Sequence, residues 1–316
     1  MNPPVVTITL PMPGPLASVN VHLVELDQGY LLVDSGWWSA ESFAALEAGL
    51  EGGGVAWSDI RTLLITHLHP DHVGNAEQVL DRTGARFLMH RIDAANLAAL
   101  AASGRSPHFD EAWRLAGVPV DLREKLDRRL RENRRPMPVR APDWSLEGGE
   151  RIAVRGGVLE VVWTPGHSAG HICLYSPGHR YLMAGDHLLE FISPNVGWRP
   201  GEDMLARFLE SLNTIERLEI DRVLPSHGEP FLDARARIQA IREHHEQRCE
   251  TILAHIREEA LTVYALVERL WSRRLGLLET NFAVLEVLAH LEYLRRRAPV
   301  AAEAQPGGAL GWRHSV

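Results

Sequence analysis

Short apolar runs alternate with turn-forming residues along the N-terminal part of the chain. The segments "VVTITL", "NVHLVEL" and "GYLLVDSG" are rich in β-forming residues and are separated by Pro/Gly-rich or Asp-Gln-Gly turns. They predict strands within residues 1–35. A helix is expected from Ala40 to Leu50, because glycines 52–54 break the pattern that follows it. The run Leu63-Leu64-Ile65 then predicts a buried strand.

The same alternation returns later in the chain. Residues 92–140 have a helical, Ala- and Arg-rich pattern broken by Gly and Pro, and they predict a helical insertion. Strand patterns resume over residues 152–181. A helix is expected from Asp203 to Leu218, and a strand in "DRVLPSHG". Because strand, helix and strand occur twice in this order, we expect two packed sheets with helices outside them.

The character of the chain changes after Pro230. "ARIQAIREHHEQRCETILAHIREE" predicts one long amphipathic helix, and "LTVYALVERLW" and "NFAVLEVLAHLEYLRRR" predict two more. A small hairpin is expected around Pro306-Gly307-Gly308. Three helices and a hairpin suggest a small winged-helix-like domain at residues 233–316, after a larger domain at residues 1–232.

Composition narrows the class of protein. The 316 residues are 45% hydrophobic and 23% charged, which is ordinary for a globular protein, and the net charge of −8 argues against a nucleic-acid-coating protein. The N-terminus lacks the pattern of a signal peptide, and no apolar run is long enough to span a bilayer. The only cysteines, Cys173 and Cys249, lie outside any CxxC motif. We therefore expect a reducing, cytoplasmic setting and no membrane partner.

One segment, "TLLITHLHPDHVGN", concentrates metal-binding residue types. His67, His69, Asp71 and His72 fall within six positions, directly after the predicted Leu63 strand. A single histidine is usually an ordinary surface or core residue. Clustered imidazoles, however, repel one another when protonated and are hard to satisfy when buried. A cation resolves both problems, and the carboxyl end of a strand is where open α/β sheets place their sites.

The rest of the chain supplies further candidates at predicted strand ends. These are His167 in "VVWTPGHSAGH", Asp186 in "YLMAGDH" and His227 in "VLPSHGEP". Each follows a short apolar run and lies near a glycine, which allows the backbone to turn tightly. A catalytic metal needs three protein ligands and an open position, so these residues could complete the first cluster.

At these motifs the sequence resembles the metallo-β-lactamase superfamily of hydrolases. The resemblance covers about residues 5–232 and implies an α/β fold, a four-layer αββα sandwich. The matching motifs, in chain order, are "LLVDSG" at 31–36, "THLHPDH" at 66–72, "TPGHSAGH" at 164–171, "GDH" at 185–187 and "SHG" at 226–228.

The resemblance also implies a site with two metals. His67, His69 and His167 would hold the first metal. Asp71, His72 and His227 would hold the second, and Asp186 would bridge the two. We expect two zinc ions, although iron or manganese could replace them at His and carboxylate ligands.

The implied reaction is attack by a hydroxide that bridges the metals. Asp71 could also accept or relay a proton, and Asp34 would orient the ligand loop. Two further histidines, His171 and His187, end two of these motifs; each has either a substrate or supporting role, or a packing role. Trp37 and Trp38 could line the pocket or pack in the core.

Differences from the typical motifs of two groups in this superfamily indicate which subgroup the chain resembles. True metallo-β-lactamases usually carry a Cys where Asp186 stands, lack the adjacent Asp71–His72 pair and are exported, so antibiotic hydrolysis is not expected. The sequence after Asp186, "HLLEFISPNVGWRP", lacks the continuation typical of glyoxalase II. Together with the helical tail it resembles a subgroup that includes hydrolases of unassigned substrate and a ribonuclease acting on single-stranded RNA.

Three functions therefore compete. The first is hydrolysis of a small-molecule ester, thioester or lactone, and the second is metal-dependent cleavage of single-stranded RNA. The third is a winged-helix nucleic-acid-binding protein with a relict hydrolase domain, against which the complete ligand set argues.

RNA binding would need a basic groove, for which the stretches 123–140 and 295–297 are the candidates, although 123–140 could equally be a solvated helix face. The acidic charge favours the first function, and the C-terminal helices could support a homodimer.

Overall fold

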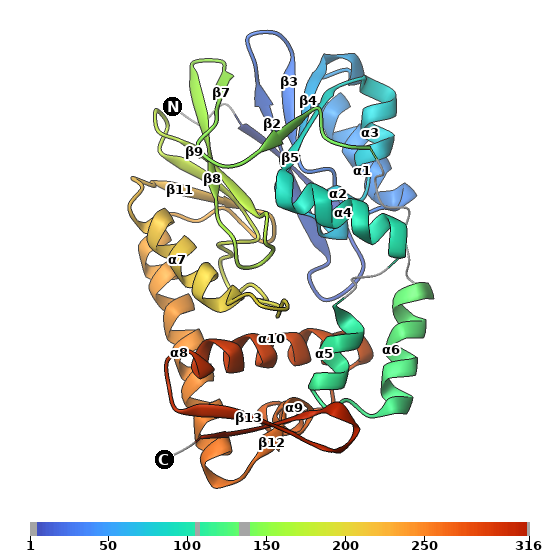
Figure 1. Ribbon diagram of the computed structural model, residues 1–316. Helices are drawn as coiled ribbons and strands as arrows, with labels where there is room; N and C mark the ends of the chain where they lie inside the picture. Colours follow the sequence, from blue (N-terminus) through green and yellow to red (C-terminus); the bar gives the residue numbers. More distant parts are fainter. Residues whose placement is uncertain (1–4, 105–107, 133–139, 315–316) are drawn as a thin grey trace. The chain divides into compact units, whose positions relative to one another are not determined.

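The computed structural model describes residues 5–104, 108–132 and 140–314 (Figure 1). Pro107 and residues 133–139 of the basic stretch lie outside this part of the chain. The strands are β1 Val5–Pro11, β2 Ser18–Glu25, β3 Tyr30–Val33, β4 Ile60–Ile65, β5 Arg86–His90, β6 Trp144–Leu146, β7 Arg151–Val154, β8 Gly157–Trp163, β9 Ile172–Ser176, β10 Tyr181–Gly185, β11 Arg222–Pro225, β12 Leu261–Thr262, β13 Val300–Ala304 and β14 Leu310–His314. The α-helices are α1 Ala40–Gly52, α2 Pro70–Val73, α3 Ala76–Thr83, α4 Arg91–Ser103, α5 Phe109–Leu115, α6 Val120–Glu132, α7 Met204–Glu216, α8 Ala234–Glu258, α9 Val263–Leu270 and α10 Leu277–Arg295.

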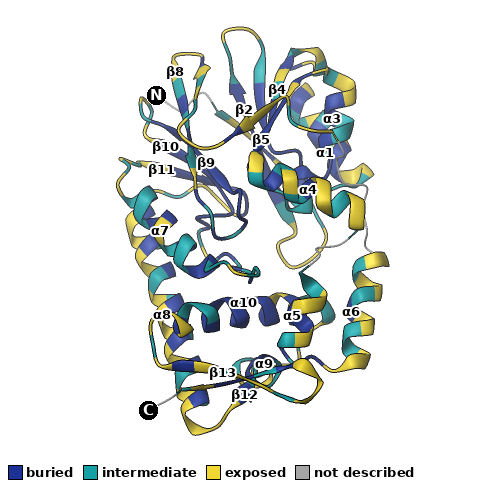
Figure 2. Ribbon diagram, viewed as in Figure 1, coloured by how far each residue is buried: buried dark blue, intermediate teal, exposed yellow. Residues whose placement is uncertain are grey.

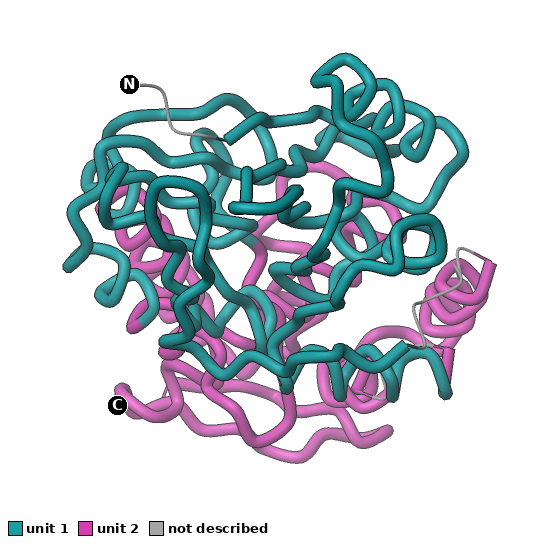
Figure 3. Tube along the Cα trace, turned by 90° about the horizontal axis from the view of Figure 1, so that it is seen from above, with its two compact units in different colours: residues 1–102, 135–194, 211–238 teal, residues 103–134, 195–210, 239–316 magenta. Residues whose placement is uncertain are grey.

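Contacts divide the chain into two compact units (Figure 3). The first unit comprises residues 1–102, 135–194 and 211–238, and the second comprises 103–134, 195–210 and 239–316. Helices α5 and α6 therefore group with the C-terminal helices. Within the second unit, for example, the Trp113 indole N–H donates to Asn281 Oδ1 at 2.8 Å. The units are discontinuous in sequence, and the expected linear boundary at residue 232 stays a prediction.

The first unit contains two sheets. One has the order β1-β2-β3-β4-β5-β6, antiparallel from β1 to β3 and parallel from β3 to β6. The other has the order β11-β10-β9-β8-β7, in which only the β10–β11 pair is parallel. The mixed α/β fold with two sheets that the sequence predicts is confirmed.

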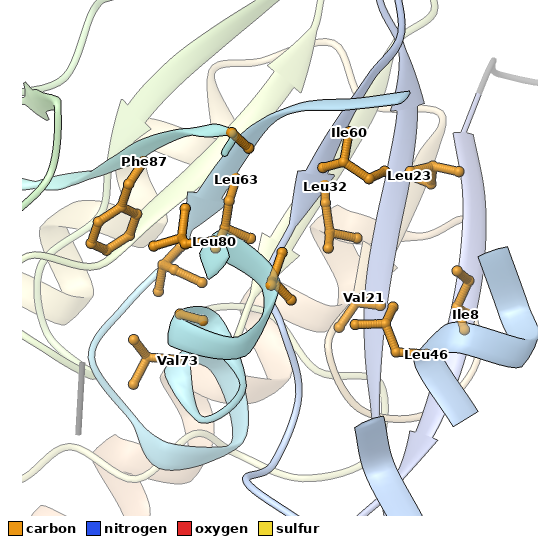
Figure 4. Packing of buried hydrophobic residues seen from close by; sticks show 14 of the residues in the cluster. Ile8, Val21, Leu23, Leu32, Leu46, Ile60, Leu63, Val73, Leu80 and Phe87 are labelled. Carbon is orange, nitrogen blue, oxygen red and sulfur yellow. The ribbon is translucent and has the colours of Figure 1, made fainter. Parts of the chain in front are cut away.

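Successive residues of β4 point to opposite faces of the first sheet, because side chains alternate along a strand. Leu63 packs in a cluster with residues of the helices α1 and α3, including Leu46 and Leu80 (Figure 4). Leu64 packs on the other face, in a cluster with residues of the second sheet such as Leu174. Leu63, Leu64 and Ile65 are all fully buried, so both faces are covered over the second half of the strand; Figure 2 colours the chain by burial. The continuous apolar run therefore belongs to a strand covered on both sides.

Two helices follow β4, and the first of them, α2, is not predicted by the sequence pattern. α2 begins at Pro70, with His69 as its N-cap residue, and α3 follows from Ala76. Proline is well suited to this first helical position, where its missing N–H would have no helical partner. This short helix places Asp71 and His72 in a helical turn, where their backbone positions are fixed.

The second unit carries the predicted C-terminal helices and hairpin. α9 and α10 precede β13 and β14, which pair as an antiparallel hairpin across the turn at Pro306–Gly308. β12 joins the same sheet, whose order is β12-β14-β13. No helix in the described residues is long and apolar enough to cross a membrane. The two cysteines are buried free thiols, one in each unit, so no disulfide joins them.

Candidate metal centre

All seven predicted ligands belong to the first unit, and each follows or lies near the end of a strand. His67 and His69 follow β4, and Asp71 and His72 lie in α2, directly after them. The other three ligands come from the second sheet: His167 from the β8–β9 loop, Asp186 from the residue after β10 and His227 from the loop after β11.

The side chains of these residues form two adjoining groups. In each group the potential ligand atoms lie within 4.8 Å of one another. One group is His67, His69, His167 and Asp186, and the other is Asp71, His72, Asp186 and His227. Asp186 is common to both. The fold thus brings together residues up to 160 positions apart in the sequence, and it separates them into the same two sets that the resemblance implies.

In the first group three imidazole nitrogens converge. His69 Nδ1 lies 3.0 Å from His67 Nε2 and 2.8 Å from His167 Nε2. The Asp186 Oδ2 atom lies 3.4 Å from His167 Nε2 and 4.0 Å from His67 Nε2. In a neutral imidazole one ring nitrogen carries the N–H and the other a lone pair. His69 Nδ1 can therefore form a hydrogen bond with only one of the two nitrogens that face it, and the other is left without a partner in this trio. Nitrogen lone pairs beside a carboxylate are the donor set that a divalent cation such as zinc prefers.

The second group contains buried polar atoms without a hydrogen-bond partner among the described residues. These atoms are His72 Nε2, Asp186 Oδ1 and His227 Nε2. They lie close together, since Asp186 Oδ1 is 3.4 Å from each of the two nitrogens. The fourth member, Asp71 Oδ2, lies 3.3 Å from His227 Nε2. Buried polar atoms are rarely left unpaired, so their convergence fits a bound cation.

The opposite ring nitrogens of these histidines are held by other groups. His227 Nδ1 donates to the Ser18 carbonyl at 2.7 Å, and His72 Nδ1 lies 2.8 Å from Asp34 Oδ2. Asp34 also accepts hydrogen bonds from the N–H and the hydroxyl of Thr66. Its φ of +64° is a conformation that Asp tolerates better than most residues. These contacts direct the Nε2 atoms of His72 and His227 toward the ligand groups, and the geometry fits the orienting role predicted for Asp34.

Gly185 allows Asp186 to reach its position. Its φ is +50°, and a Cβ there would lie 2.6 Å from His171 Nε2. That same nitrogen accepts a hydrogen bond from the Asp186 N–H at 3.1 Å, and His171 Nδ1 lies 2.8 Å from the Thr164 hydroxyl. His171 is fully buried, so it supports the backbone of Asp186.

The electrostatics of the centre favour positive charge at its middle. Burial lowers the pKa of His67 well below its usual value. Burial also opposes charge on His72, but neighbouring carboxylates, Asp34 foremost, raise its pKa well above the usual value. His227 is likewise buried, and its contacts with Asp186 and a second carboxylate raise its pKa to about 10. Two carboxylates in a low-dielectric site need compensating cations, and metal ions would supply that charge while leaving the imidazoles neutral as ligands.

The remaining candidates from the sequence do not belong to either ligand group. His187 is fully buried, and burial lowers its pKa to about 3, which fits a packing role. Trp37 and Trp38 are half-buried, and the Trp37 carbonyl accepts a hydrogen bond from Asn75. In the basic stretch, Lys125, Arg131 and Arg140 pair with nearby acids, Arg140 with Asp81 at 2.7 Å. These pairs are typical of a solvated surface.

Sequence reasoning missed one residue near the centre. Asp93, in the first turn of α4, is fully buried and hydrogen-bonds to the loops that carry His67, His69 and His167. Its sequence context gave no signal, because an acidic residue in a first helical turn is common for reasons of helix stability alone.

The sequence and the fold both match known proteins. The family model described as the metallo-beta-lactamase superfamily matches residues 14–227, and the model described as the metallo-beta-lactamase-like C-terminal domain matches residues 249–314. Among curated proteins, the chain is 27% identical over 281 residues to the Bacillus subtilis (strain 168) protein named "Probable metallo-hydrolase YqjP". That alignment covers 84% of this chain and 85% of the relative.

Two solved structures are similar over nearly their whole lengths. A metallo-beta-lactamase family protein from Thermus thermophilus is 33% identical with a TM-score of 0.84, covering 99% of both chains. A beta-lactamase domain protein from Burkholderia ambifaria is 28% identical with a TM-score of 0.88, covering 100% of this chain and 93% of that one. With the family match over most of its length and a His/Asp cluster suited to metal, the chain belongs to the metallo-beta-lactamase superfamily and is a metal-dependent hydrolase.

Proposed function

We propose that the chain hydrolyses a small-molecule ester, thioester or lactone with two bound metal ions, most simply zinc. The observation that carries this proposal is the position of Asp186 in both ligand groups. A carboxylate has two oxygens, and here Oδ2 faces the first group while Oδ1 faces the second. One side chain can therefore hold two cations side by side.

In this proposal the two groups have distinct ligands. His67, His69 and His167 would hold one cation, and Asp71, His72 and His227 would hold the other, with Asp186 contributing to both. When bound, the cations polarise the scissile bond and make water nucleophilic near neutral pH. Zinc suits the mixed imidazole and carboxylate donors, although iron and manganese accept the same donors.

The chain's own residues orient the ligands and handle the proton. The Ser18 carbonyl and the Asp34 carboxylate hold His227 and His72 with their Nε2 atoms facing inward. Asp71, which lies 3.3 Å from His227 Nε2, is placed to accept or relay the proton released from water. A covalent cysteine mechanism is disfavoured, because burial raises the pKa of the Cys173 thiol to about 12.

Charge favours a small molecule over RNA. The chain carries a formal charge of −8, and Lys125, Arg131 and Arg140 of its basic stretch are paired with acids, Arg131 with Asp127 at 2.8 Å. A single-stranded RNA site needs unpaired cations along a groove, together with aromatic platforms for the bases. The order α8, β12, α9, α10, β13, β14 supports a winged-helix-like C-terminal domain, for which we propose a packing role.

The substrate class is tested by one panel under identical conditions. Protein purified without chelator is given a thioester, a lactone, an aryl ester and a labelled single-stranded RNA, each with and without prior metal removal. We expect turnover of at least one acyl substrate, its loss after chelation, and its recovery on adding back zinc, iron or manganese. Metal-dependent cleavage of RNA alone would replace the acyl proposal with the phosphodiesterase alternative.

A further inference from the structure

Asp93 is a fully buried carboxylate outside the two ligand groups. Burial of an ionised carboxylate is costly unless its oxygens are satisfied by hydrogen bonds. The cost is met here by protein donors, because both oxygens accept hydrogen bonds at short distance. Those donors belong to the loops that carry proposed metal ligands.

The donors come from two loops that are distant in the sequence. Asp93 Oδ2 accepts from the Leu68 N–H at 3.0 Å and from the Ser168 hydroxyl at 2.6 Å. Asp93 Oδ1 accepts from the Gly170 N–H at 2.8 Å. Leu68 lies between His67 and His69, while Ser168 directly follows His167. A single carboxylate therefore ties together the two loops that carry the histidines of the first group.

The glycine at position 170 is required for this contact. A Cβ on Gly170 would lie 2.6 Å from the Asp93 backbone nitrogen and 2.8 Å from its Cγ. Contacts this short do not occur, so a side chain at position 170 would push α4 away from the loop. Gly170 thus permits the approach that brings the Asp93 carboxylate to both loops.

Asp34, in the same unit, makes comparable contacts around the second group. Its carboxylate accepts from the Thr66 N–H and holds His72 of the second group by the ring Nδ1. From these contacts we propose that Asp93 is the positioning residue of the first group, fixing the separation of the His67–His69 pair from His167. This inference rests on the proposed function, because it assumes that the first group holds a metal ion. Asp93 sets the geometry of the ligands and makes no contact with the reacting atoms.

The test replaces Asp93 by asparagine and measures metal binding. The Asn amide would turn an NH₂ group toward donors that need an acceptor, so the two loops would separate. We expect the affinity for one of the two metals to fall about 10- to 100-fold, the usual cost of losing a group that orients ligands. Titration with zinc against a chromophoric chelator gives both affinities, and cobalt absorption reports the geometry of each site.

Two comparisons make the test specific. Asp143→Asn is a control for the loss of a carboxylate that accepts a backbone N–H. Asp143 is exposed, and its Oδ2 accepts the N–H of Phe87 in β5 at 2.8 Å, away from the loops that carry the ligands. Both affinities should stay within about twofold of wild type. The site is identified by combination with ligand variants. In a His227→Ala background, Asp93→Asn should weaken binding of the remaining metal by the same factor, about 10- to 100-fold. In a His69→Ala background, it should leave the affinity for the remaining metal unchanged.

The outcomes separate this inference from the proposed function. If wild-type protein binds two metals and Asp93→Asn binds both with unchanged affinity, the positioning role is wrong while the metal centre stands. Failure of the wild type to bind more than one equivalent contradicts the proposed function itself. If Asp93→Asn does not fold, Ser168→Ala decides, since it removes one donor and keeps the carboxylate. A severalfold loss at the same site supports the inference, and unchanged affinity overturns it.

Discussion

Replacing Asp186 by asparagine is expected to lower kcat/KM about 1,000-fold or more on any substrate that the wild type hydrolyses. Removal of one electrostatic group at a reaction centre costs about 100- to 1,000-fold in rate, and this group serves both ligand sets. The neutral amide also removes the charge that balances two cations. Steady-state kinetics checks the rate, and metal analysis of the same sample should show fewer than two equivalents.

Asp221→Asn is the control for this substitution. Asp221 is exposed and pairs with Arg180 at 3.0 Å, so its loss should change kcat/KM by less than about twofold. Thermal unfolding of both variants distinguishes lost chemistry from lost fold. Full activity in a folded Asp186→Asn protein would remove this residue from the centre.

The largest stability effect is expected from Leu64→Ala. Leu64 is fully buried in the cluster between the two sheets, and it pairs in register with Val33 on one side and Leu88 on the other. Truncation of a buried leucine leaves a cavity that a packed core cannot fill, which lowers the free energy of unfolding by about 2–5 kcal/mol. Chemical denaturation followed by circular dichroism measures the change.

Val6→Ala provides the comparison. Val6 lies in β1 of the same sheet but is 51% exposed, so the same kind of truncation should cost less than about 0.5 kcal/mol. Equal losses in the two variants would show that the space between the sheets is not the tightly packed core that the cluster indicates.

The sequence predicts much of the candidate centre because the proposed ligands lie in compact motifs. His67, His69, Asp71 and His72 fall within six positions, and their types alone indicate a metal. Their division into two groups around Asp186 could be predicted only from the resemblance, since spacing does not reveal which atoms face each other. The structure supplies the distances.

Two features could not be predicted from local pattern. The sequence predicts the helices in residues 108–132 as an insertion. Nothing in their composition indicates that they contact α10, a contact that includes the hydrogen bond from Trp113 to Asn281. Asp93 looks like an ordinary residue of a first helical turn, and its importance follows only from the loops that fold against it. Both depend on long-range packing, which periodicity does not encode.

The central claim is that side chains from His67 to His227 converge on two cations that share Asp186. X-ray diffraction at the absorption edge of the metal, from crystals of metal-loaded protein, tests it directly. We expect two anomalous peaks, one within bonding distance of His67, His69 and His167, the other of Asp71, His72 and His227, with an Asp186 oxygen at each. A single peak, or none among these side chains in protein shown to carry metal, would contradict the claim.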